Sequence, residues 1–344
     1  MSLVALTRFI AGFAFENVLG RNWVRQRLQQ TKAIVYYHWI GERTAHYAEF
    51  YQGCTLERFR KDLQFLRGHF EIQPLNELIF ENGKRSSRGE LALTFDDGFD
   101  LSHPDLLQTL EDFNVKATTL VTTACLDNRH LMWRNKLSVI RETVSADVYL
   151  REYNQLMGES GYPAISSPTA LMSASFEWRM SQKDKLATEL WSRCGLEPVD
   201  DYLAKHRPYF TRKALSSWLC AGHSVGLHTH THPRCSRLSR AEIETEIVEP
   251  ARQMKREFKL DQLPFSYPFG DRLAPETEAE IFTAAGLNCA LGIQGFSPAK
   301  TPPLALEREG LEKAGANWTT LGKAVLRGIR QNRSARRTSS FQSA

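Results

Sequence analysis

The sequence has few cysteines, and their scatter excludes a disulfide framework. Six cysteines are spread over 344 residues without a Cys-x-x-Cys pair. Disulfide-stabilised domains and cysteine zinc sites both need closer spacing. We therefore expect free thiols, mostly in the core, and a reducing compartment; the six are Cys54, Cys125, Cys194, Cys220, Cys235 and Cys289.

Long uncharged apolar runs are also missing. No stretch reaches the roughly 18 to 20 residues that a membrane-spanning helix needs. The segment 1–30 is apolar early, but it has no basic leader, carries Arg8 inside its apolar part and lacks a clear small-residue cleavage site, so it is unlike a signal peptide. Its apolar residues lie along one side of a helix. This predicts an amphipathic helix that packs on its own domain or lies in a membrane interface.

The chain lacks a strong excess of charge of one sign. Its formal net charge is +5 at pH 7, and the surplus of Lys and Arg lies near the two ends, above all in the basic tail 317–344. The body is close to balanced, which does not indicate a nucleic-acid partner. An apolar first helix and a basic tail together suit peripheral membrane contact. We therefore predict a cytoplasmic protein, with a peripheral position at the inner membrane face as the alternative.

What the sequence does contain is an alternation of strand and helix patterns. Runs of apolar, aromatic or β-branched residues at Lys32–Ile40, Glu90–Phe95 and Lys116–Thr123 predict buried strands, with helical patterns between them. Helical patterns alone fill about 126–217, and the strand–helix alternation then returns. Several such units in one chain predict parallel strands in a closed or nearly closed barrel, with functional groups at the carboxyl ends of the strands. We place this domain at 31–316, with 126–217 as a helical insertion.

Two polar clusters follow predicted strands. Asp96 and Asp97 end the run in "ELALTFDDGFD", and a later loop carries three alternating histidines, His228, His230 and His232. Spacing alone does not tell which histidines share a target. Two imidazoles and one carboxylate make a three-ligand site for a divalent ion, with positions left for water and substrate. If one aspartate binds the ion, the other is available as a general base for amide or ester hydrolysis.

The ordered motifs "TFDDG", "HTHTH" (His-Thr-x-x-His) and "YPFG" resemble those of the NodB-type polysaccharide deacetylases, carbohydrate esterase family four. The resemblance covers roughly 34–306. It implies a distorted (β/α)7 barrel and a metal-dependent hydrolase that removes N- or O-acetyl groups from a saccharide, in cell-surface or exopolysaccharide metabolism. It also implies a divalent metal cofactor, with Zn²⁺ expected first and Co²⁺, Ni²⁺ or Mn²⁺ as alternatives.

The same resemblance implies roles for individual residues. Asp96 matches the catalytic base, and the implied metal ligands are Asp97, His228 and His232. His230 stands at a variable position of the motif and stays outside the metal set. The "FSYPFG" stretch resembles the loop that lines the active-site groove, so the resemblance places Phe269, through its backbone N–H, and Tyr267 on the substrate and oxyanion side.

Two departures from the family pattern raise alternatives. Ser266 stands where many members have the arginine that orients the catalytic aspartate, and Arg272 is the basic residue that we name as a substitute. The C-terminal Leu-x-His motif, which supplies the general acid, has no counterpart, because that region reads "PLALERE". One alternative is therefore a catalytically impaired saccharide-binding or scaffold protein. Another is a deformylase or deacylase of a lipid-linked sugar at the membrane face.

The missing C-terminal histidine has a candidate replacement near the N-terminus. Some relatives, including the poly-N-acetylglucosamine deacetylases, resemble circular permutations in which the histidine-bearing strand comes first. "IVYYHWI" is similar to that strand and puts His38 at its end. The resemblance thus implies that His38 is the general acid; the alternative is a core histidine with a satisfied hydrogen bond.

Overall fold

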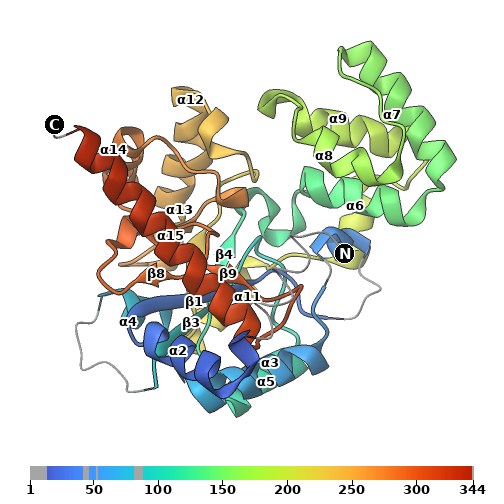
Figure 1. The fold of residues 1–344 in the computed structure, drawn as a ribbon. Helices are drawn as coiled ribbons and strands as arrows, with labels where there is room; N and C mark the ends of the chain where they lie inside the picture. The colour runs from blue at the N-terminus through green and yellow to red at the C-terminus, as the bar shows by residue number, and fades with distance from the viewer. Residues whose placement is uncertain (1–13, 42–45, 52, 81–87, 343–344) are drawn as a thin grey trace.

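The computed structural model describes residues 14–41, 46–51, 53–80 and 88–342. Its centre is a curled sheet of mostly parallel strands with helices around it, and a helical unit stands to one side (Figure 1). This is the distorted (β/α) barrel that the sequence predicts. The six cysteines are free thiols and four of them are buried, as predicted.

Six neighbouring strands form the wall of the barrel, and all of their pairings are parallel. Their order is β7-β6-β5-β4-β3-β1. They are buried on both faces, which explains why their sequences read as continuous apolar runs. Their bounds are β1 (Thr31–Tyr37), β3 (Glu90–Phe95), β4 (Thr118–Val121), β5 (Ser224–Leu227), β6 (Pro264–Ser266) and β7 (Cys289–Leu291).

Three two-residue strands complete the sheet. β2 (Glu71–Ile72) pairs in parallel with β3. β8 (Ser297–Pro298) pairs antiparallel with β1, at the end where β1 begins. β9 (Glu309–Gly310) pairs in parallel with β1 at Val35 and Tyr36.

The segment 306–310, which includes β9, closes the barrel between β7 and β1. Leu306 forms a parallel bridge with Leu291, and its carbonyl accepts a hydrogen bond of 2.8 Å from the Gly292 N–H. The segment therefore takes the place of a further parallel strand. Side chains that it turns inward share the barrel interior with those of β1 and β3.

Helices cover the outside of the barrel. They pack apolar side chains against the strands in one continuous core that also includes Leu215 and Trp218 of α11. The helices are α2 (Val18–Leu28), α3 (Leu56–His69), α4 (Leu75–Phe80), α5 (Pro104–Asp112), α11 (Arg212–Cys220), α12 (Arg240–Ile243), α13 (Glu249–Phe258), α14 (Pro275–Ala285) and α15 (Trp318–Gln342).

The chain between β4 and α11 forms a helical unit with its own apolar core. Three buried tryptophans, Trp133, Trp178 and Trp191, anchor this core together with tyrosines. We call this unit the insertion. Its helices are α6 (Trp133–Thr143), α7 (Ala146–Ser160), α8 (Leu171–Ser175), α9 (Met180–Arg193) and α10 (Val199–His206).

The two ends of the described chain pack on each other. Glu16 accepts hydrogen bonds of 3.0 Å from both the N–H and the hydroxyl of Thr319, at the start of α15. Residues 1–13 of the predicted amphipathic segment 1–30 lie outside the described residues. No helix in the described part of the chain is both long enough and apolar enough to span a membrane.

Candidate metal centre and catalytic site

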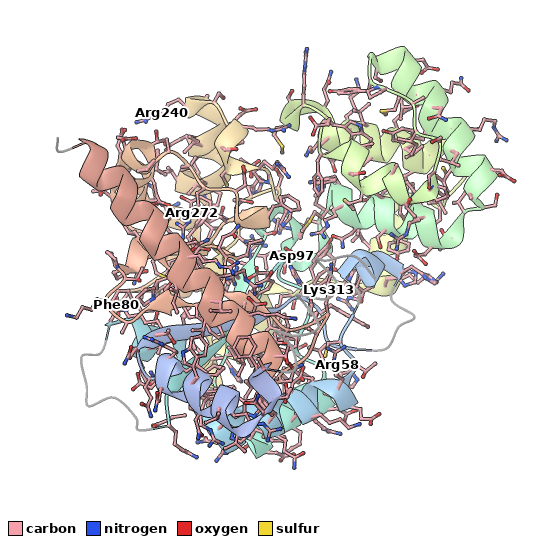
Figure 2. The ribbon with its side chains drawn as sticks, viewed as in Figure 1. Arg58, Phe80, Asp97, Arg240, Arg272 and Lys313 are labelled. Carbon is pink, nitrogen blue, oxygen red and sulfur yellow. The ribbon has the colours of Figure 1, made fainter. Side chains whose placement is uncertain are left out.

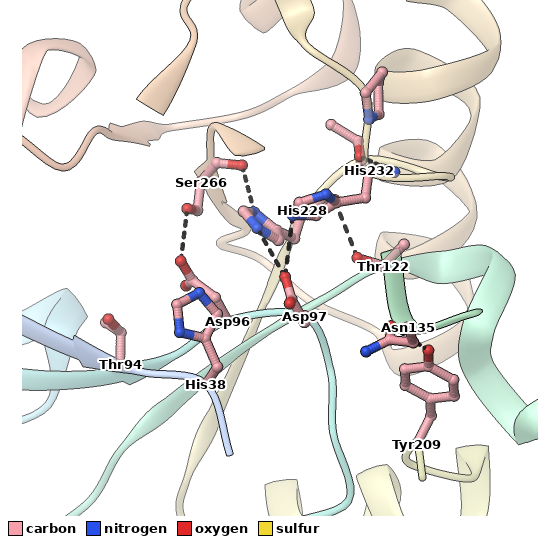
Figure 3. Close-up of polar contacts among 12 residues, drawn as sticks. His38, Thr94, Asp96, Asp97, Thr122, Asn135, Tyr209, His228, His232 and Ser266 are labelled. Atoms are coloured by element: carbon pink, nitrogen blue, oxygen red, sulfur yellow. Dashed lines mark hydrogen bonds and ion pairs between the residues drawn. The ribbon is translucent and has the colours of Figure 1, made fainter. Parts of the chain in front are cut away.

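A sharp turn after β3 separates the two aspartates. Asp97 and Gly98 both have positive φ angles, 72° and 74°, in the left-handed region that residues other than glycine rarely adopt. A Cβ at Gly98 would also approach Val121 to 3.1 Å, so the glycine is required for space as well. The turn sends Asp96 toward the barrel interior and Asp97 toward the histidine loop (Figure 3).

Three buried side chains converge as a possible ligand set for a metal. The Asp97 Oδ1 atom lies 3.3 Å from His228 Nε2 and 3.2 Å from His232 Nε2. The ligand atoms of these three residues all lie within 4.8 Å of one another. They come from two loops at the carboxyl ends of β3 and β5, where a parallel barrel gathers its functional groups.

The histidine loop is wound so that two of its three histidines face Asp97. Thr229 and His232 have φ angles of 66° and 64°, and the His232 N–H donates to Thr229 Oγ1 at 3.0 Å. The third histidine, His230, lies elsewhere, with its Nδ1 atom 2.8 Å from Thr123 Oγ1. Because non-glycine residues with positive φ are strained, such a loop persists only where surrounding contacts hold it.

The protonation states of this set suit a divalent cation. Burial raises the pKa of Asp97, but the neighbouring His232 and His228 more than offset this and hold it well below its usual value. Burial lowers the pKa of His232 to about 4, against the opposing effect of Asp97. At neutral pH an anionic carboxylate therefore meets a neutral imidazole, which are the forms that bind metals.

Hydrogen bonding supports the same conclusion. The His228 Nδ1 atom lies 2.8 Å from the Ser266 carbonyl oxygen, which only accepts hydrogen bonds, so Nδ1 carries the proton and Nε2 presents a lone pair. Both carboxylate oxygens of Asp97 and the Nδ1 atom of His232 are buried without a hydrogen-bond partner among the described residues. Buried carboxylate oxygens without donors are costly, and a cation would satisfy them. The residues present therefore fit a divalent metal ion.

The second aspartate, Asp96, is held by Arg308, a residue that we did not predict for this role. Arg308 is fully buried and forms a two-pronged ion pair with Asp96, with Nη1–Oδ1 and Nη2–Oδ2 distances of 2.7 and 2.8 Å. Nη1 also donates to Thr94 Oγ1 at 2.9 Å. Burial raises the pKa of Asp96, but Arg308 outweighs it and leaves the pKa below its usual value. Asp96 is thus ionised at neutral pH.

The proposed substitute Arg272 was wrong. Arg272 pairs with Glu278 and Glu307, at 3.0 and 3.3 Å, on the outer side of the same region. Arg308 occupies the interior instead, where its Nη2 atom contacts the hydroxyl of Ser266. The short Ser266 side chain leaves space for a guanidinium that comes from the closing segment 306–310.

His38 is oriented by a second residue that sequence reasoning missed. Its Nδ1 atom lies 2.8 Å from Glu312 Oε2, and its main-chain N–H donates to Glu312 Oε1 at 2.5 Å. Burial lowers the pKa of His38, but Glu312, and then Asp97 and Asp96, raise it above its usual value overall. His38 also lines a cavity of about 520 Å³ with Tyr36 and Glu312, so it is not a core histidine.

A sequence signal for Arg308 and Glu312 did exist. Leu306, Arg308, Gly310 and Glu312 alternate along an extended segment, and Leu306 is buried. In an extended chain, alternate side chains point to the same face. The buried Leu306 therefore indicates an inward direction for the two charged residues.

The third motif supplies one of its two expected residues to the site. The Phe269 ring packs edge-on against His232, with ring centroids 4.7 Å apart, and Phe269 has a positive φ of 59°. The Tyr267 side chain is not brought there. It is fully buried against Phe265, and its hydroxyl donates to Glu278 at 2.7 Å.

Comparisons with known proteins agree with this geometry. Residues 194–289, which contain the histidine loop and the "YPFG" turn, match the family model described as polysaccharide deacetylase. The Streptococcus pyogenes deacetylase PplD, solved in complex with acetate, has a similar structure, with a TM-score of 0.51 at 15% identity over 86% of this chain and 96% of that one. IcaB from Ammonifex degensii has a TM-score of 0.50 at 13% identity over 85% and 96%. These two structures establish the fold. No curated protein sequence matches the chain.

Proposed function

We propose that this chain is a NodB-type polysaccharide deacetylase. It hydrolyses N- or O-acetyl groups on a saccharide with the help of a divalent metal ion. The observation that carries the proposal is the separation of two adjacent carboxylates. Asp97 faces His228 and His232, while Asp96 is held apart from them by Arg308. A metal ligand and an unligated base side by side are what metal-assisted hydrolysis requires.

The chain's own residues have separable roles in this reaction. The ion held by Asp97, His228 and His232 would supply Lewis-acid polarisation of the acetyl carbonyl and a lowered pKa for water. Asp96 accepts a proton as the water oxygen bonds to the carbonyl carbon. The Phe269 N–H donates to the developing oxyanion. His38, protonated beside Glu312, gives a proton to the departing nitrogen or oxygen as the acyl bond breaks, which yields acetate and a free amine or hydroxyl.

We propose Zn²⁺ as the ion, since two imidazoles and one carboxylate with open positions are typical of catalytic zinc, and Co²⁺, Ni²⁺ or Mn²⁺ as alternatives. Acetate release from acetylated amino-sugar oligomers tests the proposal. We expect chelation to abolish release and added Zn²⁺ or Co²⁺ to restore it. His232→Ala is expected to prevent restoration, whereas His230→Ala, in the same loop but outside the ligand set, retains it. Metal-loaded protein that releases no acetate from any acetylated glycan would contradict the proposal.

The residues found around the site favour turnover over the scaffold alternative. That alternative rested on Ser266 in place of an arginine and on the missing C-terminal histidine. Arg308 supplies a guanidinium to Asp96, and His38 offers an imidazole beside the cavity. Both departures from the family pattern are therefore compensated by residues from other parts of the chain.

Replacement of Glu312 by glutamine tests His38 as the general acid. A protonated acid is lost as the pH rises through its pKa, and Glu312 raises that of His38. We therefore expect Glu312→Gln to lower kcat/KM about tenfold or more above neutral pH and to shift the alkaline limb of the pH profile to lower pH. Glu309→Gln is the matched control, since Glu309 pairs with Arg327. An alkaline limb that stays in place would contradict the role of His38.

The alternative substrate is a lipid-linked sugar at the membrane face. A protein that acts on it would lie in the cytoplasm, at the inner membrane surface. Val18 and Leu19 of α2 are 73% and 81% exposed, and the exposed Arg21 lies on the same helix. An exposed apolar pair near basic residues suits an anionic lipid surface. Binding to anionic vesicles, compared with and without residues 1–29, decides; equal binding by both forms would exclude membrane contact through this segment.

A further inference from the structure

One buried lysine of the insertion lacks the partner that such a residue usually has. Lys183, near the start of α9, is only 2% exposed. Among the described residues its ammonium has no hydrogen-bond acceptor and no carboxylate at ion-pair distance; it lies over the Trp133 and Phe176 rings, 4.6 and 5.7 Å from their centroids. Lys136, equally buried in α6, instead pairs with Asp184 at 2.6 Å. Buried lysines are almost always paired, so Lys183 needs an explanation.

Further positive charge gathers around Lys183 from the barrel side. The Arg234 guanidinium lies 5.0 Å from the Phe176 ring centroid, and its Nε atom is buried without a hydrogen-bond partner in the part of the chain that the structure describes. Arg237 donates to the Phe176 carbonyl at 3.1 Å. Burial, followed by Arg234 and Arg237, lowers the pKa of Lys183 to about 8. Like charges held close together cost stability unless an anion offsets them.

Little negative charge is available to balance this group. The carboxylate of Glu177 lies 3.8 Å from Arg237, but its side chain is 68% exposed and therefore screened by water. We call Lys183, Arg234 and Arg237 the cationic cluster. It joins α9 of the insertion to the loop and 3-10 turn (Cys235–Arg237) that follow the histidine loop of the barrel.

Two aromatic rings, Phe269 and Phe176, lie between the metal ligand His232 and the cationic cluster. Phe269 packs on His232 at 4.7 Å, and the Phe176 ring centroid is 5.0 Å from that of Phe269. The Arg234 guanidinium lies near both the Phe176 and the Phe269 ring, and its distance from the centroid of the Phe269 ring is 5.8 Å. Figure 2 shows Asp97 in the middle of the molecule, where the barrel and the insertion meet.

We propose that the cationic cluster is a subsite for an anionic group of the saccharide, a phosphate or a carboxylate, while the acetylated sugar unit lies at the metal centre. Arginine and lysine are the side chains that bind such oxyanions. The insertion thus makes the site selective for an anionic substrate. This inference rests on the proposed deacetylase function.

Binding measurements test the subsite without relying on turnover. Isothermal titration calorimetry on the full-length Asp96→Asn protein compares N-acetylglucosamine with N-acetylglucosamine 6-phosphate and with N-acetylmuramic acid, which carries a carboxylate. We expect at least one charged probe to bind about tenfold or more tightly than the neutral sugar. Whichever charged probe binds more tightly identifies the anion.

Variants separate recognition from a structural role. Lys183→Met is expected to remove the preference for the charged probe and Lys183→Arg to keep it. Lys185→Met, on the exposed side of the same helix, is the control for loss of one charge and keeps the preference. Equal binding of charged and neutral probes to the parent protein, or an unchanged preference in a folded Lys183→Met protein, would overturn the inference. A preference for the charged probe, together with no acetate release by metal-loaded protein that retains Asp96, would instead count against the deacetylase proposal alone.

Discussion

Asp96→Asn is expected to lower kcat for acetate release by about 10²- to 10⁴-fold while the protein keeps its metal. Asparagine has nearly the same shape as aspartate, but its amide does not accept the proton from water at neutral pH. The proposed metal ligands come from Asp97 and the histidine loop, so the metal content should stay at the wild-type value. Acetate release and elemental analysis of the same preparation measure both quantities.

The control for Asp96→Asn is another aspartate held by an arginine. Asp127 accepts a hydrogen bond of 2.7 Å from the Arg212 N–H and pairs with its guanidinium, outside the ligand set and the Arg308 contacts. Asp127→Asn should therefore leave kcat within about twofold of wild type, in line with the small effects of partly exposed ion pairs. Undiminished acetate release by Asp96→Asn would refute Asp96 as the base, whatever the metal content.

Arg308→Met is expected to have the largest effect on stability. Loss of one partner from a buried ion pair costs about 3–5 kcal/mol, because the remaining charge is left without compensation. Here the remaining charge is Asp96, which is 3% exposed and accepts two hydrogen bonds from the guanidinium. Urea unfolding at pH 7 measures the loss.

The pH dependence of Arg308→Met has a definite sign. In the wild type the lowered pKa of Asp96 contributes stability above the unfolded-state pKa, and this is lost as the pH falls through the folded-state pKa. Without Arg308, burial dominates and raises the pKa, so the variant's deficit in unfolding free energy should shrink as the pH falls. The acid limb of its activity should move to higher pH, because the base must be ionised.

Arg272→Met is the matched control for Arg308→Met. Arg272 also forms ion pairs with two carboxylates, but those are Glu278 and Glu307 and not Asp96. We expect this variant to lose some stability and to keep the acid limb of the wild type. An acid limb that is the same in Arg308→Met and wild type would show that Arg308 does not set the protonation of Asp96.

The two parts of the site are organised differently in the chain. Asp97, His228 and His232 come from loops that each follow one strand, and each loop carries a recognisable motif. Arg308 and Glu312, which hold Asp96 and His38, come instead from one extended segment whose residues have no motif of their own. Arg308 lies within the segment 306–310 that closes the barrel, and Glu312 follows shortly after it. A substitution that disturbs this closure is therefore expected to lower acetate release before it lowers metal binding.

Much of the fold was predictable because it depends on local patterns. Apolar runs such as Glu90–Phe95 became buried parallel strands, and the predicted distorted (β/α) barrel was confirmed. Polar residues placed at the ends of such strands meet at one edge of the sheet, which brought Asp97 close to His228 and His232 although about 130 residues separate them. For the barrel and for the meeting of Asp97 with the histidine loop, the order of motifs along the chain was enough to predict the arrangement.

The sequence by itself determined the barrel, the pair of adjacent aspartates after a strand, and the loop that carries the histidines, because each depends on residues that are neighbours in the chain. Tertiary structure alone decided which histidines meet Asp97, since left-handed turns at Thr229 and His232 override the simple alternation of a strand. It also decided that Arg308, and not Arg272, neutralises Asp96. That choice depends on the register in which the segment 306–310 closes the barrel, and register is fixed by long-range strand pairing that no local pattern encodes.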